Sequence, residues 1–345
     1  MSYQNLISKV GFGPKAYSLI SKRGESTFFL TGQEADYDIL KQRIEKSCNI
    51  KEHIEIGKES RSLEDLNKLS NKLLNKNFTQ LVVAGGGSII DLAKKIYLDQ
   101  KLSNDEFEFY VIPSRVGSGA EASITSIINS KKEKLITVDE NFLPNGIIYD
   151  NSIISKLDNI DLVFGSLDAM SHCIESMCSF NTNPYVNFLS LSAIENFRKK
   201  ISLERLLNDT KFSSLELTQF CLLSFNGGIA QNNAGAGLCH ALSHSAEQLT
   251  GVPHSICIAF FTYPTLRYTK EVDKDFLSRF DFDLLKYSHS IFQLLDKDSN
   301  FYKLKNLVAE NSKLEDLLRL ASNDPCWKLF YKKIDQTTLK NILTS

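Results

Sequence analysis

The chain has 345 residues, of which 42% are hydrophobic and 23% charged, and its formal net charge is −1. This length suits two domains, and the near-neutral charge gives no electrostatic reason to expect a nucleic acid or an anionic membrane as partner. No apolar run approaches the roughly 20 residues that span a bilayer. The N-terminus lacks the layout of a signal peptide, and the 7 cysteines are scattered without a CxxC pair. We therefore expect a cytoplasmic protein with reduced thiols.

Short apolar runs alternate with helical patterns through the first 150 residues. Buried strands are predicted at 27–32, 81–88, 107–114 and 146–150, and helices at 34–48, 62–77 and 89–98. Such alternation is typical of a parallel, doubly wound sheet whose ligand site lies beyond the carboxyl ends of the strands. The strand signal then fades, and helices are predicted at 166–179, 184–200, 214–225, 228–249 and 303–320. The pattern predicts an α/β domain over 1–150 and an all-helical domain over 151–345.

A glycine cluster, Gly85-Gly86-Gly87-Ser88, separates one of these strands from the next helix. Glycine lets backbone amides approach a ligand closely, and a helix N-terminus favours an anion, so the loop suits a pyrophosphate. The loop is neither GxGxxG nor a Walker loop, and a plain tight turn has the same composition. A second loop at 114–119 also follows a strand and is rich in hydroxyls and amides. Two such loops at adjacent strand ends favour nucleotide binding.

Four histidines and one aspartate lie in two short windows of the helical half. Asp168 and His172 are four residues apart, as are His240 and His244, so each pair shares a helix face; His254 follows a Gly-Val-Pro turn. A carboxylate with neutral imidazoles suits Fe²⁺ or Zn²⁺, and no cysteine is spaced to join it. An aspartate and a histidine on one helix can also be an ordinary side-chain pair, but buried imidazoles need partners. The spacing favours a metal site without deciding which residues bind and which acts as an acid or base.

The order and spacing of these motifs resemble the iron-containing (group III) alcohol dehydrogenase family, within the wider superfamily of dehydroquinate synthases and glycerol dehydrogenases. The similar segments are FGPKAYSLI, VVAGGGSIIDLAKKI, VIPSRVGSGAEAS, KLITVDENFLPNGIIYD, FGSLDAMSHCIES, GGIAQNNAGAGLCHALSH and VPHSICIAFFTYPTLRY. Together they run nearly from end to end of the chain. The resemblance implies a dinucleotide-binding α/β domain followed by an all-helical, metal-binding catalytic domain.

The resemblance also implies roles for individual residues. The metal ligands would be Asp168, His172, His240 and His254, and the catalytic His244 would relay a proton near the nicotinamide. The residues that line the cofactor would be Gly86, Gly87, Ser88, Asp91, Ser114, Ser118 and Lys134. The implied reaction is hydride transfer between NAD or NADP and a small alcohol or aldehyde, with Fe²⁺ or Zn²⁺ polarising the substrate oxygen. Relatives are often dimers, so the resemblance also implies a homodimer for this chain.

Two departures from the family pattern concern the substrate and the cofactor. The family usually reads Thr-Thr-Ala-Gly-Thr-Gly-Ser-Glu where this chain reads Ser-Arg-Val-Gly-Ser-Gly-Ala-Glu over 114–121. Arg115 puts a fixed cation where a small hydroxyl is common, so we hypothesise an anionic group on the substrate, as in phosphonoacetaldehyde, or on the cofactor. An arginine that faces solvent is the alternative. Gly32 stands where NAD-preferring relatives often hold an aspartate, and without that carboxylate the site would not repel the 2′-phosphate of NADPH.

Two other functions share these features. A lyase of the dehydroquinate-synthase type would use the same fold, nucleotide and metal but would regenerate its cofactor. Few lysines and arginines lie near the motifs, which disfavours its multiply charged substrate. A non-catalytic cofactor-binding protein would keep the fold, but the intact ligand set and glycine loop argue against it. Net consumption of NADH or NADPH separates a dehydrogenase from both.

Overall fold

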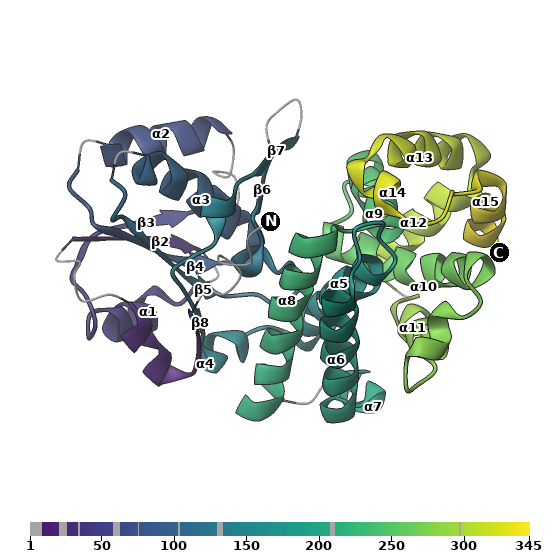
Figure 1. Ribbon diagram of the computed structural model, residues 1–345, viewed down its shortest axis with the longest axis horizontal. Helices are drawn as coiled ribbons and strands as arrows, with labels where there is room; N and C mark the ends of the chain where they lie inside the picture. The colour runs from purple at the N-terminus through teal and green to yellow at the C-terminus, as the bar shows by residue number, and fades with distance from the viewer. Residues whose placement is uncertain are drawn as a thin grey trace. The chain divides into compact units, whose positions relative to one another are not determined.

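The computed structural model describes residues 9–20, 26–33, 35–57, 63–74, 76–102, 104–129, 134–207, 211–296 and 298–345. The chain divides into two compact units. One comprises Met1–Leu157 with Phe212–Cys221, and the other Asp158–Lys211 with Leu222–Ser345. The first unit is built around a parallel sheet and the second from helices (Figure 1), so the predicted fold class is confirmed.

The sheet of the first unit is parallel throughout its described strands. These are β1 (Lys9–Phe12), β2 (Thr27–Gly32), β3 (Ile50–Ile56), β4 (Gln80–Gly85), β5 (Glu108–Pro113) and β8 (Gly146–Tyr149). Their order is β1-β8-β5-β4-β2-β3. The connection after β2 leads to one side and the connection after β4 to the other. Between β2 and β4 the sheet therefore has the topological switch point at which α/β proteins bind ligands, beyond Gly32 and Gly85.

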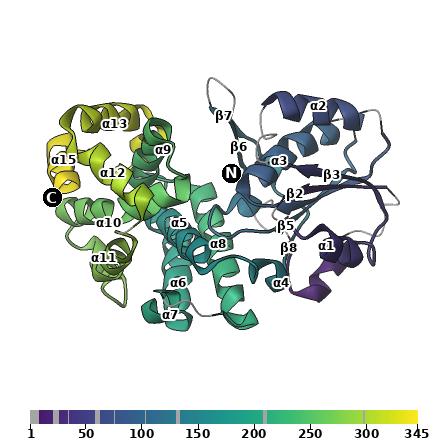
Figure 2. The ribbon, with the colours of Figure 1, turned by 180° about the vertical axis from the view of Figure 1, so that it is seen from behind.

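Helices cover both faces of this sheet (Figures 1 and 2). They are α1 (Tyr37–Ile44), α2 (Leu63–Leu74), α3 (Gly87–Lys101) and α4 (Asn151–Ile154), with 3₁₀ helices η2 (Pro14–Leu19), η3 (Ala120–Ala122) and η4 (Glu140–Phe142). Neighbouring residues of a strand point to opposite faces. Phe28 accordingly packs with the residues of α2 and α3, whereas Phe29 packs with those of α1. Strands buried on both faces read as continuous apolar runs, which is why the sequence predicts β2 and β4 well.

Three features of the first unit were not predicted from the sequence. The edge strand β3 reads IKEHIEI and the edge strand β1 is four residues long, so neither presents an apolar run. An antiparallel hairpin, β6 (Thr125–Asn129) and β7 (Lys134–Val138), packs against α3. Its strands read TSIIN and KLITV, so neither presents a long apolar run.

The second unit consists of helices packed side by side. They are α5 (Asn159–Met177), α6 (Pro184–Lys200), α7 (Leu203–Leu207), α9 (Leu238–Thr250), α10 (His254–Val272), α11 (Leu284–Leu295), α12 (Ser299–Ala309), α13 (Asn311–Asn323), α14 (Pro325–Leu329) and α15 (Gln336–Thr344), with the 3₁₀ helix η5 (Phe276–Arg279). Helix α8 (Ser214–Ala234) begins among residues of the first unit and continues into the second. Helix α10 packs against both α5 and α9. No helix in the described ranges is long and apolar enough to cross a membrane.

Two of the helices predicted from the sequence are each two helices in the structure. The stretch 228–249 contains the end of α8 and most of α9, which are separated because Gly235 adopts a left-handed φ of 81°. The break predicted at 226–227 is wrong, because α8 runs through it. The stretch 303–320 is interrupted at Glu310, whose extended backbone separates α12 from α13. The sequence reading also missed α10, which is largely apolar and holds Pro264 in its interior.

Candidate functional site

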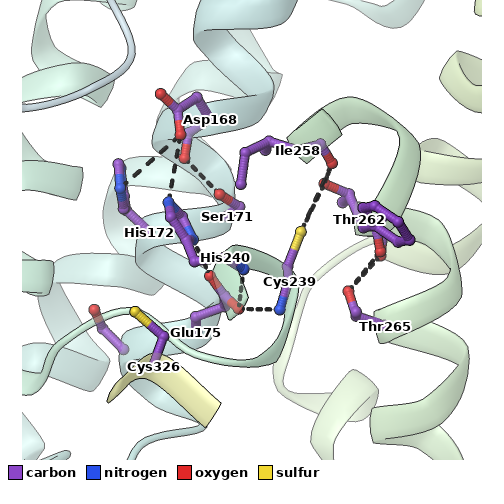
Figure 3. Close-up of polar contacts among 12 residues, drawn as sticks. Asp168, Ser171, His172, Glu175, Cys239, His240, Ile258, Thr262, Thr265 and Cys326 are labelled. Carbon is purple, nitrogen blue, oxygen red and sulfur yellow. Dashed lines mark hydrogen bonds and ion pairs between the residues drawn. The ribbon is translucent and has the colours of Figure 1, made fainter. Parts of the chain in front are cut away.

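Asp168, His172 and His240 converge in the second unit (Figure 3). Asp168 and His172 lie one turn apart on α5, and His240 lies in the first turn of α9. Asp168 Oδ1 is 3.9 Å from Nε2 of His172 and 3.6 Å from Nε2 of His240. These separations exceed the roughly 2.9 Å of a hydrogen bond. They are close to the roughly 3.4 Å that separates two ligand atoms bound at about 2.1 Å to one tetrahedral cation.

His254, the first residue of α10, lies beside the group formed by Asp168, His172 and His240. The centroid of its ring lies 5.5 Å from that of His240. The buried atoms Asp168 Oδ1, His240 Nε2 and His254 Nδ1 have no hydrogen-bond partner within the described ranges. Leaving three polar atoms unsatisfied in one buried cluster is costly, and a bound cation would remove that cost. One carboxylate with several imidazoles is a donor set that fits Fe²⁺ or Zn²⁺.

The charges of these side chains also suit a cation. Burial raises the pKa of Asp168, but the three histidines outweigh burial and hold that pKa well below its usual range. Burial lowers the pKa of His254 far below its usual range, so this ring is neutral. Burial also lowers the pKa of His240, but Glu175 and Asp168 outweigh it and raise the pKa to about 10. A metal ion and a proton therefore compete for His240, and metal binding there would release the proton.

Glu175 belongs to the cluster although the sequence analysis did not single it out. It lies on α5, three residues after His172 and seven after Asp168, so the three side chains share one helix face. One carboxylate oxygen, Oε2, pairs with Nδ1 of His240. The only signal in the sequence was this helical spacing, which ordinary surface glutamates also show.

His244 lies beside the cluster on α9, with its ring centroid 5.1 Å from that of His254. Its Nδ1 is 2.9 Å from Oδ2 of Asp324. Burial raises the pKa of Asp324, but the hydrogen bond and charge of His244 outweigh burial and lower it. The carboxylate is therefore ionised and accepts the Nδ1 proton, which leaves Nε2 of His244 for proton exchange. Asp324 was missed in the sequence because 80 residues separate it from His244.

In the first unit, the two predicted nucleotide loops lie against each other. Gly85 at the end of β4 pairs with Pro113 at the end of β5, and the amide of Ser114 donates to the carbonyl of Gly85 at 3.0 Å. A Cβ atom on Gly87 would lie 2.7 Å from Oγ of Ser118. A side chain at position 87 would require the Ser118 side chain to move, so the close contact of the two loops favours glycine here.

These loops surround the N-terminus of α3. Gly86 is the N-cap of that helix and makes no side-chain capping bond. Ser88 lies exposed in the first turn, whereas Ser114 is buried and its Oγ has no hydrogen-bond partner in the described part of the chain. The stem of Arg115 covers Gly86, with Cδ 3.2 Å from the position of an added Cβ. Backbone amides at a helix N-terminus, a buried hydroxyl and a neighbouring cation are features that suit a phosphate group.

Asp91 is engaged inside the unit. Its Oδ2 accepts from the amide of Ile127 at 3.2 Å, and its Oδ1 lies 3.2 Å from Nζ of the fully buried Lys94. Burial raises the pKa of Asp91 and lowers the pKa of Lys94, and each residue's charge partly offsets the effect on the other. These contacts attach the β6–β7 hairpin to α3, and a cofactor contact at Asp91 remains a prediction. Lys134 begins β7, but its side chain lies outside the described residues.

Comparison with known families matches nearly the whole chain. The C-terminal model of the Fe-containing alcohol dehydrogenase family matches residues 162–345, and the model of iron-containing alcohol dehydrogenases matches residues 6–151. The chain belongs to the iron-containing alcohol dehydrogenase family. As a family member it is an oxidoreductase, and the resemblance drawn from its motifs is confirmed.

Curated relatives of this family member include two dehydrogenases. The 4-hydroxybutyrate dehydrogenase of Clostridium kluyveri is 28% identical over 300 residues, which are 80% of each chain. Alcohol dehydrogenase 4 of Saccharomyces cerevisiae is 30% identical over 204 residues, 54% of this chain and 53% of that protein.

Solved structures of the family share the fold. An iron-containing alcohol dehydrogenase from Thermococcus thioreducens has a TM-score of 0.82 at 20% identity, covering 98% of this chain and 97% of that one. The sulfoacetaldehyde reductase from Bifidobacterium kashiwanohense, solved in complex with NAD⁺, has a TM-score of 0.83 at 16% identity, with the same coverage. At these identities the likeness establishes the shared fold.

Proposed function

We propose that this enzyme transfers hydride between NAD or NADP and a small alcohol or aldehyde, with help from a divalent metal ion, Fe²⁺ or Zn²⁺. The metal would be held by Asp168, His172, His240 and His254 in a catalytic domain over 151–345, and the dinucleotide by the loops of a domain over 1–150. The observation that carries the proposal is the cluster in which Asp168 Oδ1, His240 Nε2 and His254 Nδ1 are buried without hydrogen-bond partners among the described residues. When bound, the metal supplies Lewis acidity toward the substrate oxygen, and the nicotinamide supplies or accepts the hydride.

The residues of this chain then have separate tasks. Asp168 stays ionised and places a negative charge where the cation would sit. His244, fixed by Asp324 through Nδ1, presents Nε2 to give or take the proton that accompanies hydride transfer. The backbone amides at Gly86 and Gly87 would hold the pyrophosphate, with the hydroxyls of Ser88, Ser114 and Ser118 at the same loops.

The first test combines metal analysis with turnover. Purified protein is assayed for bound iron and zinc, and for oxidation of NADH and NADPH with a panel of neutral and anionic aldehydes. We expect one metal ion bound per chain, and one NADH or NADPH oxidised for each aldehyde molecule reduced. The variant His254→Ala should lose metal and hydride transfer together, because it removes one of the four proposed ligands. Full activity in metal-free protein would contradict the proposal, and nucleotide binding without turnover would support a binding protein instead.

Arg115 is exposed in the second loop, and we propose that it binds an anionic group, the pyrophosphate of the cofactor. The contact of its stem with Gly86 supports this partner, because Gly86 begins the helix whose N-terminus would hold the phosphates. An anionic aldehyde such as phosphonoacetaldehyde is the alternative. Its support comes from two relatives whose names contain anionic compounds, 4-hydroxybutyrate and sulfoacetaldehyde.

Arg115→Ala distinguishes these partners. Loss of one charge-assisted contact of about 1.5–3 kcal/mol would weaken NADH binding roughly 10- to 100-fold. Lys51→Ala, which removes an exposed lysine from β3, controls for the change in net charge. If Arg115 serves the cofactor, kcat/KM falls equally for neutral and anionic aldehydes. A loss confined to anionic aldehydes, with unchanged NADH affinity, would assign Arg115 to the substrate.

A further inference from the structure

Glu175 is a buried carboxylate in the middle of the helical unit, with 6% of its surface exposed. It lies near the end of α5, on the helix face that also carries Asp168 and His172. A carboxylate is expensive to bury unless hydrogen bonds satisfy its oxygens. The contacts of Glu175 therefore indicate which role its burial serves.

The first set of contacts is with the backbone of α9. Oε1 of Glu175 accepts from the amide of Cys239 and from the amide of His240, the latter at 3.2 Å. These amides belong to the first turn of α9, which its N-cap, Gly237, cannot cap with a side chain. A Cβ atom on Gly237 would lie 3.2 Å from the same carboxylate oxygen. Glu175 therefore caps α9 from a different helix and fixes the position of its first turn.

The second contact is with the His240 side chain itself. Oε2 of Glu175 pairs with Nδ1 of His240, so the other ring nitrogen, Nε2, points toward Asp168 (Figure 3). Oε1 of Glu175 already accepts from two backbone amides, and its Oε2 accepts the Nδ1 hydrogen of His240 in the same way. A metal ion at Nε2 would then replace the second ring proton, on the side of Asp168 and His172.

We infer that Glu175 is a positioning residue for the metal centre: it holds His240 in the ring orientation and tautomer that bind a cation together with Asp168 on α5. The inference rests on the proposed metal centre. Carboxylates that orient a ligating histidine in this way typically contribute a factor of about 10–100 to metal affinity. Glu175 is not one of the four proposed ligands, so its removal should weaken binding without abolishing the site.

The test is a titration of metal-free protein with Co²⁺, whose visible spectrum reports on its ligands. Wild type should bind one Co²⁺, and Glu175→Gln should bind it about 10- to 100-fold more weakly, with an altered spectrum. Glu195→Gln removes a carboxylate from the partly exposed surface of the neighbouring α6 and should leave the Co²⁺ affinity unchanged.

The outcomes separate the inference from the proposed function. Failure of wild-type protein to bind Co²⁺ would overturn the metal centre and the inference with it. Binding by wild type and equal binding by a folded Glu175→Gln would overturn only the role of Glu175, and would show that it merely caps α9. If Glu175→Gln does not fold, Glu175→Asp keeps the charge but draws it back by one methylene. That variant should still lose Co²⁺ affinity relative to wild type, and an unchanged affinity would overturn the inference.

Discussion

Replacing Gly227 by alanine tests how closely α8 must approach the part of α5 that carries Asp168 and His172. An added Cβ would lie 2.8 Å from the carbonyl oxygen of Ala169 and 3.4 Å from Cβ of His172. The carbonyl belongs to the α5 backbone, directly after Asp168. It cannot rotate away as a flexible side chain would, so one helix has to move.

The magnitude follows from two opposing terms. Glycine to alanine inside a helix usually stabilises a protein by about 0.5–1 kcal/mol. Overpacking of a closely packed contact costs about 1–3 kcal/mol. We therefore expect a net loss of up to about 2.5 kcal/mol in the free energy of unfolding. Relieving the contact requires α5 or α8 to shift by about 0.5 Å, which is as large as the tolerance within which metal ligands must be held. Because α5 carries Asp168 and His172, the affinity for Co²⁺ should fall about 10-fold.

Urea unfolding of the metal-free protein and Co²⁺ titration measure the two effects. Asn226→Ala is the control, since it raises the helix propensity at the preceding, partly buried residue of α8. We expect the control to be at least as stable as wild type. If Gly227→Ala were also as stable as wild type, with unchanged Co²⁺ affinity, the close approach of α8 to α5 would not constrain the metal centre.

Two further variants test individual pairs. Asp324→Asn should lower kcat about 10-fold or more with metal content unchanged, because His244 loses the acceptor that fixes its Nδ1 proton; loss of metal would refute this assignment. The folded pKa of Asp324 is lowered, so its stabilisation is present above the ordinary pKa of about 3.9 and is lost as the pH falls below it. The difference in urea stability between wild type and this variant should therefore narrow in acid. Asp91→Asn leaves the Lys94 ammonium buried without its counterion and should cost about 3–5 kcal/mol on urea unfolding. A variant that keeps wild-type stability but loses NADH affinity would instead assign Asp91 to the cofactor.

Local patterns made much of the fold predictable. The strands β2, β4 and β5 are buried on both faces and read as apolar runs ending at glycine or proline. The placement of Asp168 with His172 and of His240 with His244 on single helices follows directly from their spacing. The edge strands β1 and β3 were missed because each pairs with a neighbouring strand on one side only and neither presents an apolar run. The division between α8 and α9 was missed because it depends on the φ angle of Gly235.

The sequence by itself determined which chemical groups the chain has, and on which helix faces and strand ends they lie. It could therefore predict a metal-ligand set and two nucleotide loops, whose roles stay predictions. Only the tertiary structure decided which carboxylate meets which imidazole: Glu175 pairs with His240, and Asp324 with His244. It also directed Asp91 toward the β6–β7 hairpin. The physical reason is distance along the chain, since spacing within one helix or strand fixes neighbours over a few residues. Contacts across 65 or 80 residues depend on how whole helices pack.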